Sequence, residues 1–338
     1  MTHSSFKGVF KDPRRKRAFL KTLWVFIVVL ILPTVIIGIY YYRDFRLRLT
    51  DAVLEQHRTL ADLSASSLKV RLDSIGKIAK SLATEEALQS SVKKGNWNDA
   101  ILRAEDLSNQ VDYYDPFIDR ILLIDSSGTI EAAYPRLFGS VGAQSTSFQE
   151  WEAPIVAGKE FYITNVYKRK AMPTINVVGV VAPVKTASTT IGFVLLQIPT
   201  NNFSDLGKYV DVGRDGFAYF FDRLGHIIAH PKFSSDGPIV DYSAVPAVNK
   251  AIHGEEGVEV LYNPIERQER VSAYEQVPDY GWGVVAQDPS AEAFADRDSI
   301  LIGIAILTAI VSLIELCVAA LTWELIDEYS TNGSSAKK

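Results

Sequence analysis

Two long apolar stretches bracket the chain and set its organisation. Residues 22–42 carry no charge, and residues 299–323 carry a single one, Glu315. At about 1.5 Å of helix per residue, each stretch is long enough to cross a hydrocarbon core of about 30 Å. The first stretch ends in Tyr40, Tyr41 and Tyr42, which suits an interfacial anchor better than a cleaved signal peptide. The pattern therefore predicts two transmembrane helices.

The region after the first span has helical periodicity. Apolar residues recur at helical spacing with charged residues on the other faces, at Leu68, Leu72, Ile75, Ala79 and Leu82. Residues 43–74 contain no glycine or proline, so nothing in this stretch interrupts a helix. We predict one long membrane-proximal helix over residues 43–81.

The pattern then changes to short strands, and it repeats. "RILLIDSSGTIEAAYP" and "FAYFFDRLGHIIAHP" each place an Asp-x-x-Gly turn between apolar runs, at Asp125 to Gly128 and Asp222 to Gly225. This arrangement favours a tight hairpin, and a second pair of apolar runs follows each copy. We predict an α+β fold with two tandem antiparallel-sheet modules. We name residues 82–201 the distal module and residues 202–289 the proximal module.

Charge and cysteine usage place these segments. Residues 1–21 are strongly basic, which predicts a cytoplasmic N-terminus, while residues 43–298 lie outside the cell's inner membrane and residues 324–338 form a short cytoplasmic tail. Residues 290–298 form a juxtamembrane linker. The single cysteine, Cys317, lies in the second span, so the outer region is stabilised by its core and not by disulfides. The acidic outer region argues against nucleic acid as a partner.

Four stretches in this order resemble the double Cache (dCACHE) family of extracytoplasmic sensors. They are "FQEWEAPIVAGKEFYITNVY", "VVGVVAPVKTASTTIGFVLLQI", "GFAYFFDRLGHIIAHP" and "YGWGVVAQDP". The resemblance covers nearly the whole outer region and implies that both antiparallel-sheet modules are PAS-like. It implies that the distal module holds a small-molecule ligand, that the proximal module relays the signal, and that the receptor is a homodimer.

Amino-acid sensors of that family use an arginine and a tryptophan, followed by a tyrosine about sixteen residues later. Trp151 and Tyr167 match the tryptophan and the tyrosine, whereas the arginine position holds Gln149 and the aromatic position holds Glu152. The resemblance therefore implies a pocket with aromatic walls and changed polar groups.

The acids that bind the ligand's ammonium group in those sensors are also replaced. Arg169 stands at one acid position and Gln197 at the other. A guanidinium suits a carboxylate or phosphate, so we expect an anionic or polyhydroxylated ligand and not a typical amino acid. The alternative is that Trp151 and Tyr167 are core aromatics, with Lys168 to Lys170 in a solvated loop.

Other candidate chemistry is sparse. His226 and His230 are four apart on an expected strand, too far apart to chelate one metal. No phosphate loop, nucleophile elbow or zinc-spaced pair is present, so we expect no metal, no cofactor and no enzymatic activity. Glu315 inside the second span is a candidate for transmembrane coupling to another subunit, or lies near the inner interface or is protonated.

The sequence thus predicts a membrane-bound sensor, or chemoreceptor input protein, that signals through its spans to a separate partner. Only "ELIDEYSTNGSSAKK" follows Trp323, and we expect this tail to be disordered. The alternatives are a non-signalling membrane-tethered solute-binding or scaffolding protein, and a truncated receptor that has lost its transmitter.

Overall fold

The computed structural model describes residues 13–112, 117–135, 140–187, 189–208, 210, 212–213 and 215–335. It divides the chain into two units, one formed by residues 1–53 with 294–338 and the other by residues 54–293. We describe each unit by itself. The basic side chains of the N-terminus lie mostly outside the described residues.

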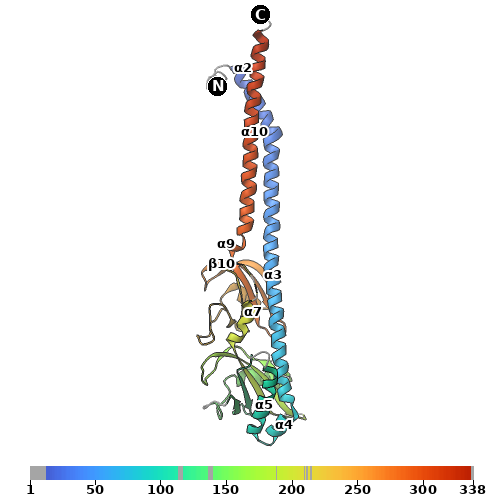
Figure 1. The fold of residues 1–338 in the computed structure, drawn as a ribbon, viewed down its shortest axis with the longest axis vertical. Helices are drawn as coiled ribbons and strands as arrows, with labels where there is room; N and C mark the ends of the chain where they lie inside the picture. The colour runs from blue at the N-terminus through green and yellow to red at the C-terminus, as the bar shows by residue number, and fades with distance from the viewer. Residues whose placement is uncertain are drawn as a thin grey trace. The chain divides into compact units, whose positions relative to one another are not determined.

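The first unit contains two helices that are long and apolar enough to cross a membrane. The N-terminal one begins as α2 (Pro13–Phe26), passes through a π-helical turn, η1 (Ile27–Ile31), and continues as α3 (Leu32–Thr84). Leu32 separates this turn from Pro33, whose ring prevents regular α-helical packing against the preceding turn. Helix α10 (Ala295–Ser335) lies beside these segments (Figure 1).

The end of α10 corrects one expectation. The sequence predicted that a disordered tail follows the second span. Instead the helix continues to Ser335. Residues 324–331 contain no proline or glycine and include good helix formers such as Leu325, so the helix extends past the apolar stretch.

The second unit contains the remainder of α3 and two sheets that follow one another along it (Figure 1). The predicted apolar face of α3 is confirmed, because Leu68, Leu72, Ile75 and Ala79 are all buried. Helix α4 (Glu86–Lys93) follows α3, and the Glu85 carboxylate caps it by accepting the N–H of Leu88. Helix α5 (Trp97–Asp112) completes this helical layer.

The distal module contains a six-stranded antiparallel sheet. Its strand order is β2-β1-β6-β5-β3, with β4 also paired to β5. The strands are β1 (Arg120–Ile124), β2 (Ile130–Tyr134), β3 (Tyr162–Ile163), β4 (Tyr167–Lys168), β5 (Asn176–Thr186) and β6 (Thr189–Pro199). Helix α6 (Phe148–Val156) lies in the long connection between β2 and β3.

The proximal module repeats this plan with five strands in the order β8-β7-β11-β10-β9. The strands are β7 (Phe217–Phe221), β8 (Ile227–Ala229), β9 (Gly257–Asn263), β10 (Gln268–Gln276) and β11 (Gly283–Pro289). Helix α8 (Pro246–Ile252) takes the place of α6. The short helices η2 (Thr200–Phe203) and α7 (Ser204–Lys208) precede this sheet, and α9 (Ser290–Ala293) follows it.

Both predicted hairpins are confirmed and share one geometry. In β1–β2 the Asp125 carboxylate accepts the N–H groups of Ser127 and Thr129. In β7–β8 the Asp222 carboxylate accepts those of Leu224 and His226. Gly128 and Gly225 close the turns at φ of 89° and 85°, a backbone region that favours glycine. The α+β fold with two antiparallel modules is therefore as predicted.

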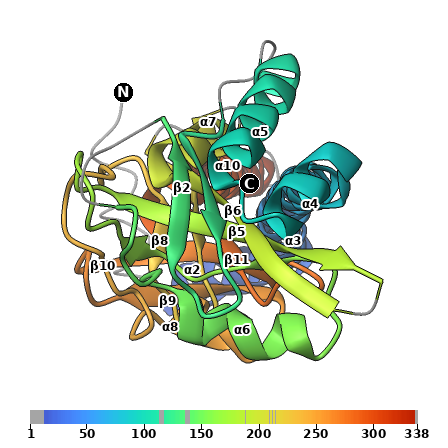
Figure 2. The same ribbon diagram turned by 90° about the horizontal axis from the view of Figure 1, so that it is seen from below.

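The distal sheet has a different core on each face. One face packs against α3, α4 and α5 in the largest hydrophobic cluster, through residues such as Val180 and Leu196. The other face packs against α6, through residues such as Val181 and Leu195. Figure 2 shows α3, α4 and α5 on one side of β5 and β6, with α6 on the other. Alternating strand residues therefore place a second, separate set of side chains under α6.

Candidate ligand-binding site

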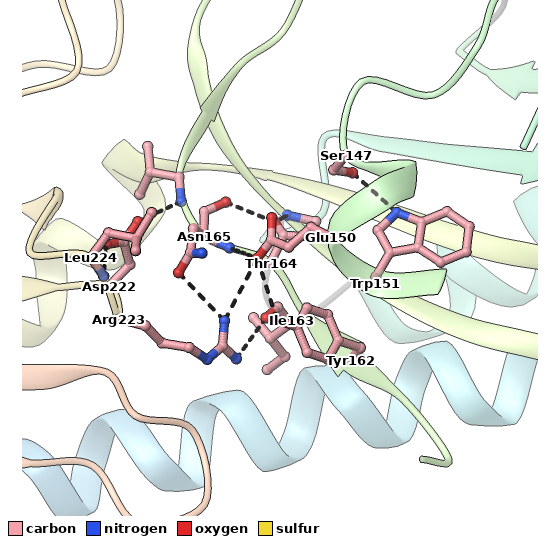
Figure 3. Close-up of polar contacts among 12 residues, drawn as sticks. Ser147, Glu150, Trp151, Tyr162, Ile163, Thr164, Asn165, Asp222, Arg223 and Leu224 are labelled. Carbon is pink, nitrogen blue, oxygen red and sulfur yellow. Dashed lines mark hydrogen bonds and ion pairs between the residues drawn. The ribbon is translucent and has the colours of Figure 1, made fainter. Parts of the chain in front are cut away.

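Helix α6 brings Trp151 onto the sheet face opposite the long helix. The Trp151 side chain is fully buried, with its ring centroid 4.9 Å from that of Phe148 and 4.7 Å from that of Phe193. Its indole Nε1 donates to the Ser147 hydroxyl at 3.2 Å (Figure 3). The indole N–H of Trp151 is therefore hydrogen-bonded, and its ring packs among aromatic side chains. We call the rings of Phe148, Trp151 and Phe193 the Trp151 wall.

Tyr167 and Gln197 meet beside this wall. Gln197 lies on β6, and its Nε2 donates to the Tyr167 hydroxyl at 3.0 Å. Gly179 lies opposite Gln197 on β5, and a Cβ there would lie 3.3 Å from the Tyr167 oxygen, so glycine leaves the space that the tyrosine uses. Burial, opposed by the Gln197 hydrogen bond, raises the pKa of Tyr167 to about 12. The tyrosine is therefore a neutral hydrogen-bonding group.

Arg169 is buried next to Tyr167, one residue past β4. Its exposed fraction is 2%, its Nη1 contacts a carboxylate oxygen of Asp119, and its Nε donates to the Pro173 carbonyl at 3.0 Å. Among the described residues, Arg169 Nη2 has no hydrogen-bond partner. A buried guanidinium with an unused donor is costly unless another acceptor satisfies it.

A second arginine lies in the same place. Arg120 begins β1 directly opposite Gln197, is 3% exposed, and donates from Nη2 to the Met172 carbonyl. Its Nε lies 3.7 Å from the same Asp119 oxygen that Arg169 contacts. Burial, together with the positive charge of Arg169, lowers the pKa of Arg120 to about 10. It remains charged at neutral pH.

The charges of this cluster do not cancel. Two buried guanidinium groups share one carboxylate, Asp119, whose side chain is 38% exposed. In addition to Arg169 Nη2, the Gln197 Oε1 acceptor is buried without a partner in the described part of the chain. The cluster thus offers positive charge, a free charged donor and a free neutral acceptor. A small oxyanion fits this set best.

The helix that carries Trp151 also contacts the proximal module (Figure 3). The Glu150 carboxylate on α6 accepts the Asn165 N–H at 2.7 Å and lies 3.7 Å from Arg223 Nη1. Arg223, in the β7–β8 turn, donates to the Ile163 carbonyl at 2.8 Å. Burial raises the pKa of Glu150, against the Asn165 hydrogen bond and the Arg223 charge. These contacts join the candidate site to the second sheet.

Asp222 provides a second link between the modules. Its fully buried carboxylate accepts the Val166 N–H at 2.8 Å in addition to the two N–H groups of its own turn. Val166 directly precedes Tyr167 in the sequence. The proximal hairpin therefore holds the backbone that carries the distal site.

The structure brings together most of the predicted site residues, but not all of them. Tyr167, Arg169 and Gln197 converge next to the Trp151 wall, whereas Gln149 is exposed on α6 and does not join them. Glu315 lies in the other unit, where its Oε1 accepts the Thr34 hydroxyl at 2.7 Å. This contact links the two apolar helices within one chain.

Sequence reasoning did not single out Arg120 or Asp119. The available signal was a charged pair directly before a buried apolar run, since "DRILLID" places two ions at the start of β1. The histidines take other roles. His226 Nδ1 lies 3.2 Å from Asp222, and His230 packs among aromatic rings. No group of three potential metal ligands occurs in the part of the chain that the structure describes.

The chain matches a known protein family and a chemotaxis protein. A family model described as Cache domain, dCache_1, matches residues 43–296. A probable methyl-accepting chemotaxis protein of Bacillus thuringiensis subsp. konkukian (strain 97-27) is 23% identical over 279 residues, which is 82% of this chain and 40% of the relative. The chain thus spans about two fifths of the length of that relative.

Two solved structures share the fold at low sequence identity. The ligand-binding domain of the Pseudomonas aeruginosa PAO1 amino acid chemoreceptor PctB, in complex with L-Arg, has a TM-score of 0.54 and 17% identity, covering 72% of this chain and 98% of that one. The ligand-binding domain of the Pseudomonas fluorescens chemoreceptor CtaA, in complex with L-isoleucine, has a TM-score of 0.53 and 13% identity, covering 74% and 98%.

Proposed function

The chain belongs to the Cache domain family, and from this premise we propose that it is a two-span membrane sensor whose distal module binds a small anionic or polyhydroxylated molecule. The observation that carries the ligand class is the pair of buried arginines, Arg120 and Arg169, with the single carboxylate of Asp119 between them. The related chemoreceptor domains support small-molecule sensing in general. The proposal assigns the chain no catalytic activity.

The same cluster argues against an amino acid as the ligand. The two solved relatives hold L-Arg and L-isoleucine, and the ammonium group of any amino acid needs carboxylate or carbonyl acceptors around it. Here Arg169 would lie close to that ammonium group, and like charges in a buried site repel each other. A carboxylate without an amine would instead gain the unused Arg169 Nη2 donor, and a hydroxyl group could donate to Gln197 Oε1.

We further propose how the chain is placed and how it signals. The basic N-terminus is cytoplasmic, residues 43–298 are extracytoplasmic, and ligand binding changes the relative position of the two spans, which contact each other through Thr34 and Glu315. A separate partner reads this change, and the receptor acts as a homodimer. The ligand shifts the arrangement only by binding one state more tightly than the other.

A thermal-shift screen of the full chain in detergent tests the ligand class. Carboxylic acids, sugars, amino acids and nucleobases are added singly, and a ligand that binds only the native state raises the melting temperature. We expect a carboxylate or polyol to do so in the wild type and in Lys170→Met, an exposed neighbour, but not in Arg169→Met. Shifts by amino acids alone, unchanged in Arg169→Met, would contradict the proposal.

Disulfide crosslinking distinguishes signalling from simple tethering. Cys317 is first replaced by serine, and single cysteines are placed near Arg43 and Asp298. A sensor should change its crosslinking rate when ligand saturates the site. An unchanged rate at saturating ligand would favour the non-signalling tether.

A further inference from the structure

The proximal module buries a polar cluster on the same sheet face that the distal module uses for its site. Gln287 on β11 pairs directly with Phe217 on β7 and with Ser272 on β10. In the distal sheet, Gln197 on β6 pairs in the same way with Arg120 on β1 and with Gly179 on β5. The two glutamines thus occupy equivalent positions in the two modules.

Several buried polar atoms around Gln287 have no partner. Within the described residues these include the Tyr219 hydroxyl, Arg270 Nη1 and Gln287 Oε1, on side chains that are 0%, 4% and 0% exposed. Cross-strand neighbours on one face, including diagonal ones about 7–8 Å apart, are within reach of long side chains. Tyr219, Gln287 and Arg270 lie on three adjacent strands of this face, so their free atoms can meet one small molecule.

Glu266, Lys232 and His230 make the other polar contacts of the cluster. Glu266 lies 2.5 Å from Arg270 Nε and accepts from Gln287 Nε2 at 3.3 Å and from Lys232 Nζ at 3.4 Å. His230 Nδ1 accepts the Lys232 N–H, and burial lowers the pKa of His230 against the effect of the nearby Glu266 carboxylate. Arg270 and Lys232 therefore outnumber the single carboxylate of Glu266.

Aromatic rings enclose the cluster. The Arg270 guanidinium lies 5.2 Å from the Phe217 ring centroid, and the Tyr219 ring lies 5.3 Å from His230 and 5.4 Å from Tyr242. Such walls exclude water, so hydrogen bonds formed inside them are stronger than those formed in water. Ser272, the small residue opposite Gln287, adds little bulk at the centre of the face.

We propose that the proximal module holds a second ligand site, formed by Tyr219, Arg270 and Gln287, for a small 2-hydroxycarboxylate. The carboxylate accepts from Arg270 Nη1 and from the Tyr219 hydroxyl, and the 2-hydroxyl donates to Gln287 Oε1. In this pairing Arg270 Nη1 and the Tyr219 hydroxyl act as donors and Gln287 Oε1 acts as an acceptor, which are the roles open to these atoms. It is independent of whether the distal site takes an anion.

Calorimetric titration of the full chain in nanodiscs tests the site, with glycolate, L-lactate and L-malate as probes and acetate, propionate and succinate as counterparts without the hydroxyl. Each probe is titrated into the wild type and into Arg169→Met, which removes a distal arginine. We expect at least one 2-hydroxycarboxylate to bind both proteins, more tightly than its counterpart. No saturable heat from any of these probes in the wild type would overturn the proposal.

Tyr219→Phe is the decisive variant because it removes a hydroxyl that has no partner, so folding should be unaffected. We expect it to weaken 2-hydroxycarboxylate binding by about tenfold or more, the usual worth of a hydrogen bond to a charged group. The matched control is Tyr274→Phe on the same face, whose hydroxyl is occupied by Glu259 at 2.6 Å, and its affinity should be unchanged. Equal affinities in the wild type and Tyr219→Phe would overturn the site.

Discussion

The distal and proximal modules have the same backbone plan but differ in how their buried arginines are paired. Each begins with an Asp-x-x-Gly hairpin, and each places a glutamine at the same sheet position, Gln197 or Gln287. In the proximal module Glu266 pairs directly with Arg270, whereas in the distal module two buried arginines share one half-exposed acid. The turns are therefore common to both modules, whereas the polar side chains on the corresponding sheet face differ.

The two hairpin aspartates should differ most in their contribution to stability. Asp222→Ala leaves the buried N–H group of Val166 and the partly buried N–H groups of Leu224 and His226 without their acceptor, so we expect a loss of about 3–5 kcal/mol. Asp125→Ala removes the more exposed equivalent and should cost about 1 kcal/mol. Denaturant unfolding of both variants measures the difference, and equal losses would show that the module link through Val166 contributes nothing.

A second, buried acid in the distal cluster should pair its arginines as closely as Glu266 pairs Arg270 in the proximal one. In Gln197→Glu the new carboxylate lies opposite Arg120 and near Arg169, so we expect the free energy of unfolding to rise by about 1–2 kcal/mol at neutral pH. The affinity for carboxylate ligands should fall by about tenfold or more. Thermal unfolding with and without ligand measures both effects. Unchanged carboxylate affinity would contradict the role of net positive charge.

Much of this comparison could be predicted from the sequence, because it depends on local signals. The two hairpins follow from the spacing of aspartate and glycine, and the buried face of α3 follows from the repeat of Leu68, Leu72 and Ile75. The pairing of β1 with β6 could not be predicted in this way. It joins Arg120 to Gln197, residues far apart in the chain, through hydrogen bonds that leave no local pattern.

The positions of two other residues show the same limit. Gln149 and Trp151 are two apart on α6, and a helix turns about 200° between such residues, which puts one in water when the other is buried. The sequence motif grouped Gln149 with Trp151 by their spacing alone, without regard to the face of the helix on which each residue lies.

The extent of α10 past Trp323 was missed because low hydropathy was interpreted as disorder, although the residues there favour helix.

A partly buried acid in the proximal module, Glu275, should make the free energy of unfolding depend on pH. Burial, with the hydrogen bond to Asp62 on α3, raises the pKa of Glu275 to about 7. A raised pKa of an acid in the folded state means that stability is present below the unfolded value and is lost as pH rises towards 7. We expect a loss of about 1–2 kcal/mol between about pH 4.5 and pH 7.5, allowing for solvent screening.

Glu275→Gln should flatten this dependence, because the amide keeps the hydrogen-bonding capacity without the titration. Unfolding of the wild type and the variant by denaturant at several pH values measures the slope. Glu131, on distal strand β2, is the matched control position for a glutamine replacement, and that variant should keep the wild-type slope. A wild-type slope in Glu275→Gln would assign the pH dependence to other groups.

The smallest expected effect concerns the lysine run after Tyr167. Lys168 Nζ donates to the carbonyls of Asp236 and Gly237 in the proximal module, at 3.1 Å and 2.7 Å, whereas Lys170 is exposed. Lys168→Ala should cost about 0.5–1 kcal/mol and Lys170→Ala close to nothing. Thermal unfolding of both variants measures the difference. An equal response would mean that these two hydrogen bonds do not hold the modules together.

Calorimetric titration of the best ligand from the thermal-shift screen into the wild type, Arg169→Met and Lys170→Met tests whether Arg169 binds an anionic or polyhydroxylated ligand. We expect a carboxylate or polyol whose binding heat is present in the wild type and Lys170→Met and lost in Arg169→Met. An amino acid that binds all three proteins equally, with no heat from carboxylates or sugars, would contradict it.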